Sequence, residues 1–360
     1  MEKKLRVGIV GCGGIATQKH LPALAAIQEV EVVAFCDLIL EKAQEAKEEF
    51  GTADAKVCTD YKELAADKDI DVIHVCTPNS SHSEISVAAL MGGKHVCCEK
   101  PMAINSAEAK AMVDAAKASG KKLTIGYQNR HSPDTSHLKK ICAAGELGEI
   151  YYAKAYAVRR RAVPTWGVFL DKEKQGGGPL IDIGTHALDL TLWCMDNYEP
   201  KMVVGSTFYK LGKQKNAGNA WGDWDTETFD VEDSAVGFIV MKNGATVVLE
   251  ASWALNTLDT REAQCTLCGT LAGADMDDGL RINKISHNRQ TVETPNLKAG
   301  GVAYFSGDDN DRPGFIEARL WINAILNDTD VVVKPEQAYV VTQILEAVYE
   351  SAKTGQPVYF

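Results

Sequence analysis

Two carboxylates and an imidazole stand in one row within an otherwise apolar segment, residues 180–190. Asp182, His186 and Asp189 are spaced i, i+4 and i+7, so on a helix all three would point to the same side. An imidazole titrates near neutral pH, which suits proton transfer to or from a substrate. The alternative is a core histidine bonded locally to Asp182 or Asp189, and a purely structural role for Asp189 is equally open.

A second cluster, near the N-terminus, has the composition of a dinucleotide site. Gly11, Gly13 and Ala16 follow an apolar strand in the order G-x-G-x-x-A and open a helical segment. Such glycines let the backbone approach a pyrophosphate, and the helix N-terminus supplies unpaired N–H groups. Asp37 ends the next strand, where a carboxylate binds a ribose 2′-hydroxyl and repels a 2′-phosphate. The sequence therefore predicts NAD rather than NADP.

Polar residues also follow two later strands. Thr77-Pro78-Asn79 comes after one strand, and Glu99-Lys100-Pro101 comes after the next. Ligands bind at the carboxyl ends of the strands in open α/β sheets, so we expect Lys100 to face the ligand crevice. The Thr77 segment could instead cap the helix that starts near Ser81.

The elements that must hold these clusters form an α/β pattern with two expected domains, residues 1–126 and 127–360. Short apolar runs alternate with amphipathic helical stretches in the first domain, which is typical of a Rossmann domain with a doubly wound parallel sheet. The expected strands there are 5–10, 30–36, 71–76, 95–98 and 122–126, and the expected helices are 15–27, 41–50, 82–91 and 106–119.

The pattern changes after residue 127 to one helix followed by longer strands, which predicts an α+β domain with a large open, mostly antiparallel sheet. Asn243-Gly244 is a strong hairpin signal between two of these strands. Residues 212–230 are expected to form a long loop. The expected helices are 134–144, 315–326 and 335–353, and the expected strands are 149–158, 202–211, 234–241, 245–253 and 263–271.

Composition limits the partners and the compartment. The 360-residue chain has a net charge of −11, which disfavours nucleic acid. No apolar run reaches the ~20 residues of a membrane span, and no signal peptide is recognisable, so we expect a cytoplasmic protein. Most of the ten cysteines stand singly in apolar runs, and the one C-x-x-C pair, Cys265 and Cys268, lies in a strand, so no metal is expected.

Taken together, the motifs resemble those of the Gfo/Idh/MocA family, the NAD-dependent oxidoreductases that include glucose-fructose oxidoreductase and inositol dehydrogenase. The resemblance spans essentially the whole chain, and its most specific part joins Glu99-Lys100-Pro101 to Asp182-x-Gly184-x-His186. Gly126–Arg130 and Gly177-Gly178 also match. The resemblance implies hydride transfer between a secondary alcohol of a sugar or cyclitol and the nicotinamide. It also implies that Lys100 contacts both cofactor and substrate, and that Asp182 and His186 match the later motif's functional pair.

Site residues follow from the motifs and the resemblance together. The expected catalytic residues are Lys100, Asp182 and His186. The expected cofactor-binding residues are Gly11, Gly13, Gly14, Ile15, Asp37, Thr77, Pro78, Asn79, His82, Glu99, Lys100 and Asn129. The expected substrate-binding residues are Lys100, Tyr127, Arg130, Arg159, Arg161, Trp166, Asp182 and His186. Trp221 and Trp224 on the long loop could offer aromatic faces to a sugar ring, or they could pack in the core or a subunit interface.

The expected activity is that of an NAD-dependent dehydrogenase acting on a CH–OH group of a sugar, glycoside or cyclitol, with C3 of a hexopyranoside as one candidate position. Three alternatives remain open. They are an NAD-dependent glycosidase that works through transient oxidation, a reductase of imines or biliverdin-like compounds, and a non-catalytic protein that senses NAD and sugar. An open sheet face needs cover, so a homodimer or homotetramer is expected.

Overall fold

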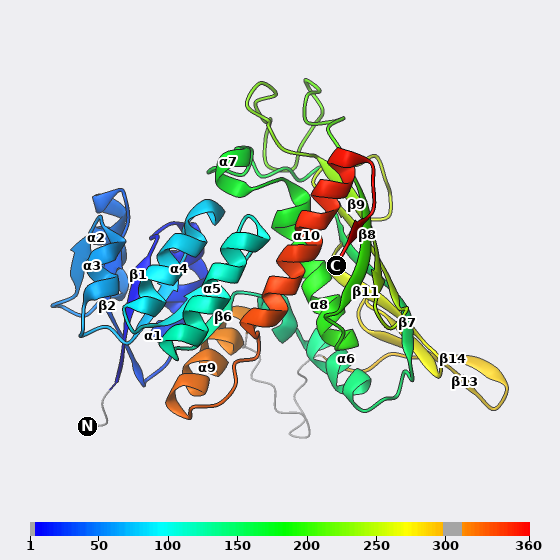
Figure 1. Cartoon of the computed structure of the whole chain (residues 1–360), viewed down its shortest axis with the longest axis horizontal. Helices are drawn as coiled ribbons and strands as arrows, with labels where there is room; N and C mark the ends of the chain where they lie inside the picture. The colour runs from blue at the N-terminus through cyan, green and yellow to red at the C-terminus, as the bar shows by residue number, and fades with distance from the viewer. Residues whose placement is uncertain (1–3, 298–311) are drawn as a thin grey trace. The chain divides into compact units, whose positions relative to one another are not determined.

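The computed structural model describes residues 4–297 and 312–360 and divides the chain into two compact units (Figure 1). The first unit comprises Met1–Gln128 and Asn310–Tyr339, and the second comprises Asn129–Asp309 and Val340–Phe360. A single boundary after residue 126 therefore does not describe the division completely, because a segment near the C-terminus returns to the first unit.

A six-stranded parallel sheet forms the centre of the first unit, in the order β3-β2-β1-β4-β5-β6. The order reverses between β1 and β4, which is the switch point where ligands bind in folds of this class. Val7, Ile9 and Phe35 are fully buried, as expected for a sheet covered on both faces. The strands are β1 (Leu5–Val10), β2 (Val30–Cys36), β3 (Lys56–Cys58), β4 (Val72–Val75), β5 (His95–Cys98) and β6 (Leu123–Ile125).

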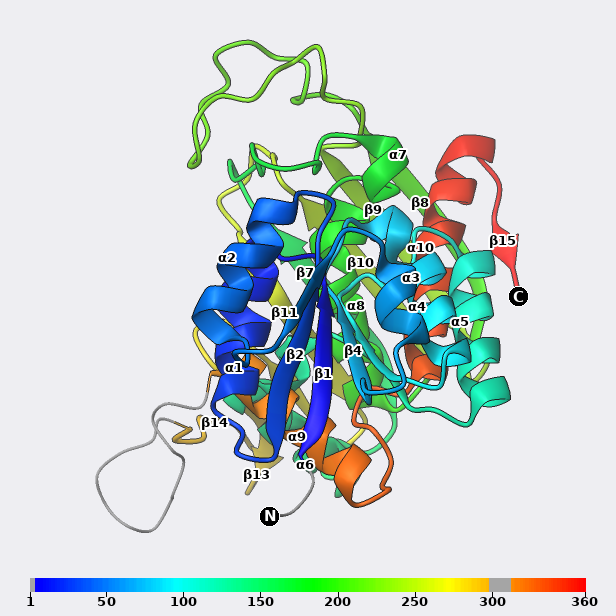
Figure 2. The same cartoon turned by 90° about the vertical axis from the view of Figure 1, so that its left-hand side faces the viewer.

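Helices cover both faces of this sheet (Figure 2). On one side lie α1 (Leu21–Ala25) and α2 (Leu40–Phe50), and on the other lie α3 (Tyr61–Ala66), α4 (His82–Met91) and α5 (Ser106–Ser119). The late helix α9 (Pro313–Leu326) packs on α1, and its Trp321 and Ile322 join the core around Leu21. Apolar contact thus explains why this distant segment belongs to the first unit.

A nine-stranded sheet forms the second unit, in the order β14-β13-β12-β11-β7-β10-β9-β8-β15. Only the β7–β10 pair of this sheet is parallel among the described residues, so the expectation of a large, mostly antiparallel sheet is confirmed. The Asn243-Gly244 turn joins β9 to β10, with Gly244 at φ 91°. The strands are β7 (Ile150–Val158), β8 (Pro200–Phe208), β9 (Ser234–Met241), β10 (Thr246–Ser252), β11 (Arg261–Gly269), β12 (Ala272–Asp275), β13 (Arg281–Ser286), β14 (Arg289–Glu293) and β15 (Val358–Tyr359).

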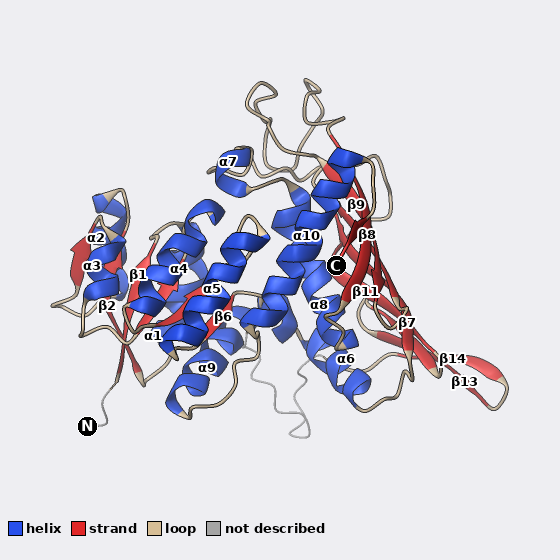
Figure 3. Ribbon diagram, in the orientation of Figure 1, coloured by secondary structure: helices blue, strands red, loops and turns tan. Residues whose placement is uncertain are grey.

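Helices cover one face of the second sheet (Figure 3). Helix α8 (Thr185–Met195) packs on β7 and β11, and α6 (Pro133–Ala143) packs on α8; the short α7 (Lys172–Gln175) precedes α8. Helix α10 (Pro335–Thr354) packs closely on β8 and β9 at Gly205 and Gly237, which are paired in the strand register. A Cβ added to these glycines would lie 2.6 Å and 2.9 Å from the methyl carbons of Val348, so larger residues would displace α10.

The opposite face of this sheet exposes apolar side chains. Val204 and Phe208 on β8 and Val236 and Phe238 on β9 are all exposed, and Val204 lies opposite Phe238 in the register. We call these four residues the outer sheet patch. A contiguous apolar patch on a folded unit is typical of an interaction surface.

The alternating strands and helices expected for the first unit are confirmed, and short elements account for most differences. Strand β3 has three residues and α3 has six, too few for a periodic pattern to show. Among residues 4–297 and 312–360, no helix combines the length and apolar character that crossing a membrane would require.

Candidate active site

The glycine loop after β1 is shaped by its close approach to the end of β4. Gly11 has φ 89°, and a Cβ there would lie 2.5 Å from the carbonyl oxygen of Cys76, so no larger residue fits. Beside Gly13, an added Cβ would meet no described heavy atom within 4 Å. Open space next to backbone N–H groups at a helix start is what a pyrophosphate requires. The geometry therefore fits the expected phosphate-binding role of Gly11, Gly13, Gly14 and Ile15.

Asp37 holds this loop from the tip of β2. Its Oδ2 accepts a hydrogen bond from the Cys12 N–H at 2.8 Å, and its Oδ1 accepts one from the Ile39 N–H at 2.9 Å. The adjacent Leu38 is 90% exposed and supplies no cation for a 2′-phosphate. The carboxylate thus stands where a ribose hydroxyl is expected, and it also shapes the glycine loop.

His82 joins two of the loops that follow strands. Its Nδ1 lies 2.7 Å from the carbonyl oxygen of Pro101, and its Nε2 lies 2.9 Å from that of Thr77. The ring is fully buried, and burial lowers the pKa of His82 although both carbonyl oxygens favour the protonated form. In this structure His82 positions Thr77 rather than presenting a surface to a cofactor.

A buried group of charges lies against Glu99-Lys100-Pro101. Lys19 Nζ lies 2.7 Å from Glu99 Oε1 and 2.8 Å from Glu317 Oε2. Glu99 Oε1 also meets His20 Nε2 at 2.8 Å, while Glu99 Oε2 accepts a hydrogen bond from the Lys100 N–H at 3.1 Å. We call Lys19, His20, Glu99 and Glu317 the Lys19 cluster. Glu99, expected to contact the cofactor, is buried within it and fixes the backbone of Lys100.

Charges in the Lys19 cluster shift one another's protonation. Burial opposes the charge of Glu99, but Lys19 and His20 outweigh it and hold the pKa of Glu99 well below its usual range. Burial raises the pKa of Glu317, which Lys19 only partly offsets and Glu99 increases further. Burial also opposes the charge of Lys19, yet Glu317 and Glu99 raise the pKa of its ammonium above the ordinary value. Lys19 is thus the cation that makes burial of two carboxylates tolerable.

His20, His74 and Cys97 are of the types that bind metals, and their donor atoms lie within 4.8 Å of one another. His20 Nδ1 and His74 Nδ1, however, lie 2.8 Å apart and share a hydrogen bond. Burial raises the pKa of the Cys97 thiol well above its usual value. In this structure the two imidazoles are partners of each other, and His20 also contacts Glu99.

In the second unit, Asp182 and His186 lie where helix α8 begins. Residues Leu180–Gly184 form a π-helical turn that leads into α8 at Thr185, so Asp182 and His186 do not share one regular α-helix. Such turns alter the direction of side chains and occur often at functional sites. Every residue from 180 to 190 is buried except His186, which is half-buried. His186 is therefore the least buried residue of this segment, although Nδ1 of its imidazole is buried.

Asp182 is fixed by a residue that the sequence did not indicate. The indole N–H of Trp253, directly after β10, donates to Asp182 Oδ2 at 3.0 Å, and the Trp253 ring is fully buried. Because Trp253 is 71 positions away in the chain, no local spacing relates it to Asp182. The bond fixes the position of the Asp182 carboxylate just before α8 begins.

Glu232 holds the chain that enters the π-turn. Its carboxylate accepts hydrogen bonds from the N–H groups of Gly178 and Leu180 at 2.8 Å and 3.1 Å, and from the Tyr349 hydroxyl at 2.8 Å. A Cβ on Gly177 would lie 2.1 Å from the Tyr349 hydroxyl oxygen, and one on Gly178 would lie 2.2 Å from the Glu232 carbonyl oxygen. The Gly177-Gly178 pair is therefore required for this close fit.

Arg130 corrects one expectation, because it is fully buried and cannot offer its guanidinium to a substrate in this structure. Arg130 Nε and Nη2 donate to Asp189 Oδ2 and Oδ1 at 2.8 Å and 2.6 Å, and Nη2 also contacts the Tyr198 hydroxyl at 3.3 Å. Burial raises the pKa of Asp189, and Arg130 opposes that shift. The pair links the start of the second unit to α8. It also explains how the Asp189 carboxylate can be buried, because Arg130 supplies its hydrogen bonds and a positive charge.

The other expected ligand contacts differ in exposure. Ile15 and Pro78 are exposed, and Thr77, Lys100 and Asn129 are half-buried; Asn79 and Tyr127 are buried. The guanidinium of Arg161 bonds to the carbonyl oxygens of Ala217 and Arg160 and to Asn256 Oδ1, at 3.2 Å, 2.7 Å and 2.6 Å. In this structure Arg161 therefore holds the long loop.

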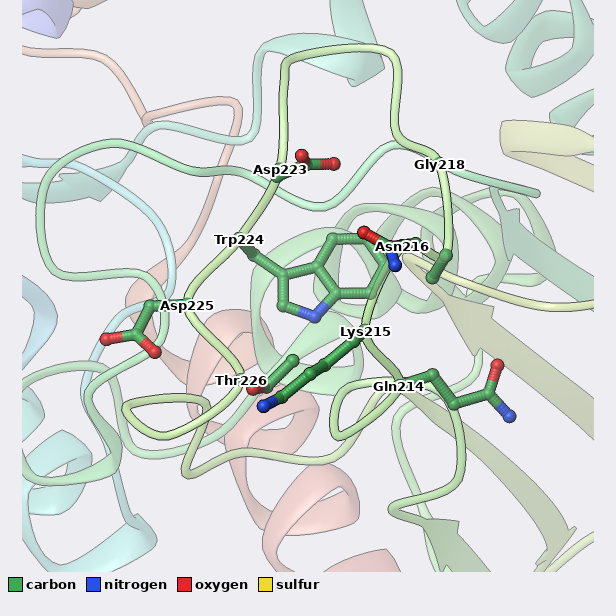
Figure 4. Close-up of a pocket in the computed structure, with 9 residues that line it drawn as sticks. Gln214, Lys215, Asn216, Gly218, Asp223, Trp224, Asp225 and Thr226 are labelled. Carbon is green, nitrogen blue, oxygen red and sulfur yellow. The ribbon is translucent and has the colours of Figure 1, made fainter.

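The three tryptophans considered for sugar contact separate into two groups. Trp166 and Trp221 are exposed and lie in edge-to-face contact, with ring centroids 5.1 Å apart. Trp224 is buried, and its indole N–H donates to the Gly212 carbonyl oxygen at 2.8 Å. Figure 4 shows Trp224 within a hollow whose lining comes only from loop residues 214–218 and 223–226. That hollow contains neither Asp182 nor His186, so Trp224 serves the packing of the loop.

Comparison with known proteins gives consistent matches along the chain. A family described as an oxidoreductase family with an NAD-binding Rossmann fold matches residues 5–127, and the GFO/IDH/MocA C-terminal domain matches residues 135–274. D-glucoside 3-dehydrogenase of Escherichia coli (strain K12) is 38% identical over 351 residues, which cover 98% of this chain and 96% of that protein. Inositol 2-dehydrogenase of Salmonella typhimurium is 38% identical over 147 residues, or 40% of this chain and 43% of that protein. The solved structure of levoglucosan dehydrogenase with NADH and levoglucosan is 25% identical, with a TM-score of 0.82 and 99% of each chain covered.

Proposed function

Because this chain belongs to the Gfo/Idh/MocA family of oxidoreductases, we propose that it transfers a hydride between NAD(H) and a secondary ring hydroxyl of a sugar or glycoside, with C3 of a D-glucoside as the first candidate. The similarity to D-glucoside 3-dehydrogenase covers nearly the full length of both chains, which supports this substrate class. The observation that carries the catalytic proposal is the half-buried His186 in an otherwise buried segment, four residues after Asp182, whose carboxylate Trp253 holds.

NAD is the cofactor of the first unit, whose glycine loop leaves open space at Gly13 and whose Asp37 stands at the tip of β2. When bound, NAD would supply the hydride acceptor for oxidation of an alcohol, and NADH would supply the donor for the reverse reaction. Backbone N–H groups of the glycine loop would hold the pyrophosphate, and Asp37 would hold the ribose hydroxyls. Without a cation at Leu38, the loop favours NAD over NADP.

The side chains supply the remaining parts of the reaction. His186 takes the hydroxyl proton as the hydride leaves, because a neutral imidazole is a base near physiological pH. We assign to the Lys100 ammonium the stabilisation of negative charge that develops on the substrate oxygen. Asp182, held by Trp253, orients the imidazole or binds a neighbouring hydroxyl. Glu99 fixes the backbone of Lys100 and so positions its side chain.

The direct test is to incubate the protein with NAD and methyl β-D-glucoside and to identify the product by mass spectrometry and NMR. We expect a 3-keto glucoside formed together with NADH. Release of free glucose without net NADH would instead support the glycosidase that works through transient oxidation. Turnover of imines or biliverdin-like compounds without sugar turnover would refute the substrate class, and ligand binding without any turnover would indicate a sensor.

Replacing Asp37 with serine is expected to raise the KM for NAD about tenfold, the value of one hydrogen bond to a charged group, and to narrow the preference for NAD over NADP. The carboxylate is lost from the ribose position while serine keeps a short polar side chain near Cys12. Steady-state kinetics with both cofactors would measure the change, and Asp114→Ser on the exposed face of α5 is the matched control. An unchanged NAD/NADP ratio would remove Asp37 from the ribose site.

We also propose that a second copy of the chain covers the outer sheet patch, giving a homodimer or a homotetramer. Four exposed apolar residues on adjacent strands are costly to leave in water. Phe238→Glu is expected to weaken association about a hundredfold or more, because it would bury a charge without a partner. Light scattering after gel filtration would measure the mass, with Leu258→Glu on an exposed loop as control. A wild-type protein that is monomeric at micromolar concentration would contradict the proposal.

The cytoplasm is the compartment we propose. All ten cysteines are free, as is usual in reducing compartments. The net charge of −11 supports a small neutral substrate rather than nucleic acid or an anionic membrane surface as the partner.

A further inference from the structure

Four aromatic rings of the second unit form a continuous series that starts at the partner of Asp182. The ring centroids of Trp253 and Phe169 are 6.3 Å apart, those of Phe169 and Trp166 are 6.0 Å apart, and those of Trp166 and Trp221 are 5.1 Å apart. Each contact is edge-to-face, the geometry that aromatic pairs favour. We call these four rings the aromatic ladder. One end is fixed at Asp182 through the Trp253 indole, and the other end is open to solvent.

The rings of the aromatic ladder become more exposed to solvent from Trp253 to Trp166 and Trp221. Trp253 is fully buried, whereas Trp166 is 52% exposed and Trp221 is 43% exposed. Two adjacent indoles that remain in contact with water are unfavourable in the free protein, because their apolar area is hydrated. A pair of this kind is typical of a surface that meets a ligand.

The exposed pair is also held in place by its neighbours. The guanidinium of Arg159 lies over the Trp221 ring, 5.3 Å from its centroid, and bonds to both carboxylate oxygens of Glu262. The Thr165 hydroxyl donates to the Trp221 carbonyl oxygen at 2.8 Å. Asn219 exchanges two hydrogen bonds with the backbone of Val163, each at 2.9 Å. These bonds fix the long loop against the segment that carries Trp166, so the two rings are preorganised.

We propose that Trp166 and Trp221 bind the aglycone of a glycoside substrate, by stacking on a planar apolar group attached to the sugar. This inference rests on the proposed function. Because Asp182 is bonded to Trp253 at one end of the ladder, a sugar bound at Asp182 and His186 would have its substituent on the side of Trp166 and Trp221. Arg159 is already neutralised by Glu262, so the site favours a neutral aryl group over a phosphate or carboxylate. The preferred substrates are aryl glucosides rather than free glucose or a sugar phosphate.

The test compares phenyl β-D-glucoside with methyl β-D-glucoside, which share the reacting sugar and differ only in the aglycone. For the wild-type protein, we expect kcat/KM to favour the phenyl compound about threefold to tenfold, the range for one aromatic stacking contact. Trp166→Ala and Trp221→Ala should each bring this ratio toward one. Trp166→Phe and Trp221→Phe should retain most of it, because they keep an aromatic face. Tyr359→Ala removes an exposed aromatic elsewhere in the unit and should leave the ratio unchanged.

The possible outcomes separate this inference from the proposed function. Oxidation of both glucosides with equal kcat/KM, or a phenyl preference that survives both alanine variants, would overturn the aglycone site and leave the oxidoreductase proposal standing. If neither glucoside is oxidised, the proposed function is refuted. The binding affinities of the two glucosides then test the proposed aglycone site. Equilibrium dialysis in the presence of NAD should then still show tighter binding of phenyl than of methyl glucoside, and Trp166→Ala should remove the difference. Thermal unfolding of each alanine variant at the wild-type temperature excludes a folding defect as the cause.

Discussion

Replacing His186 with asparagine is expected to lower kcat about a hundredfold to ten-thousandfold while NAD binding is retained, which is the usual contribution of a general base. Asparagine keeps a polar group of similar size but accepts no proton at neutral pH. His186 is the least buried residue of segment 180–190, so its replacement removes the base without opening the core. Single-turnover measurement of NADH formation, with NAD affinity measured separately, would test this expectation.

A matched control is available in His287→Asn. His287 is exposed in the turn between β13 and β14 at φ 49°, a conformation that asparagine adopts readily. This variant should keep wild-type kcat. If His186→Asn also kept near-normal turnover, the assignment of the proton acceptor would be wrong.

Lys100→Met provides a second variant that separates the roles of the two residues. We expect it to lower kcat by about a hundredfold or more, because a charged donor to the developing alkoxide is lost. If His186 is the base, the rate of Lys100→Met should still fall at acidic pH, whereas that of His186→Asn should lose this dependence. The reverse pattern would make Lys100 the proton acceptor. Lys110→Met, in an exposed pair on α5, is the control.

Local sequence was sufficient to predict the features that depend on a few adjacent residues. The G-x-G-x-x-A segment predicts a close backbone approach, and the structure places Gly11 against Cys76 as that requires. Asn243-Gly244 predicts a hairpin because glycine adopts positive φ, and the hairpin is present. In both cases the cause and the effect lie within a short stretch of chain.

Long-range pairing could not be predicted in this way. Arg130 and Asp189 are 59 positions apart, so no local sequence pattern indicated that the guanidinium would pair with a buried carboxylate. The i, i+4 argument for Asp182 and His186 assumed a regular α-helix, whereas Leu180–Gly184 form a π-turn that closes around Trp253 and Glu232. The packing of α9 in the first unit could not be predicted either. An amphipathic pattern indicates that one face of a helix is buried, but it does not indicate which unit covers that face.

Replacing Lys19 with methionine is expected to reduce the stability of the first unit by about 3–5 kcal/mol, the usual cost of removing one partner from a buried ion pair. Lys19 is the ammonium shared by Glu99 and Glu317, and all three side chains are almost fully buried. Methionine fills a similar volume but leaves two carboxylates facing each other in a medium of low polarity. Hydrogen exchange of peptides from β5 and α9 would report the change in local opening free energy.

Two companion variants show whether charge or packing is responsible. Lys56→Met removes a lysine whose side chain is 61% exposed and paired with Asp67, and it should cost no more than about 1 kcal/mol. Glu317→Gln should also be mild. Burial raises the pKa of Glu317 above its value in the unfolded chain. Ionisation of Glu317 therefore favours the unfolded state as the pH rises from the unfolded pKa through the folded pKa. Glutamine cannot ionise, so this variant avoids the destabilisation that a buried carboxylate causes at neutral pH. Equal losses for Lys19→Met and Lys56→Met would contradict a central role for the buried ammonium.

The Lys19 cluster also connects stability to catalysis, because Glu99 accepts a hydrogen bond from the Lys100 backbone. Without Lys19, the pKa of Glu99 should rise, since the cation that opposes the effect of burial is gone. A carboxylate without this cation would bind the Lys100 N–H less firmly. Lys19→Met should therefore lower kcat as well as stability, although the Lys19 side chain is largely buried. A variant that is destabilised but keeps wild-type kcat would show that the cluster supports the fold alone.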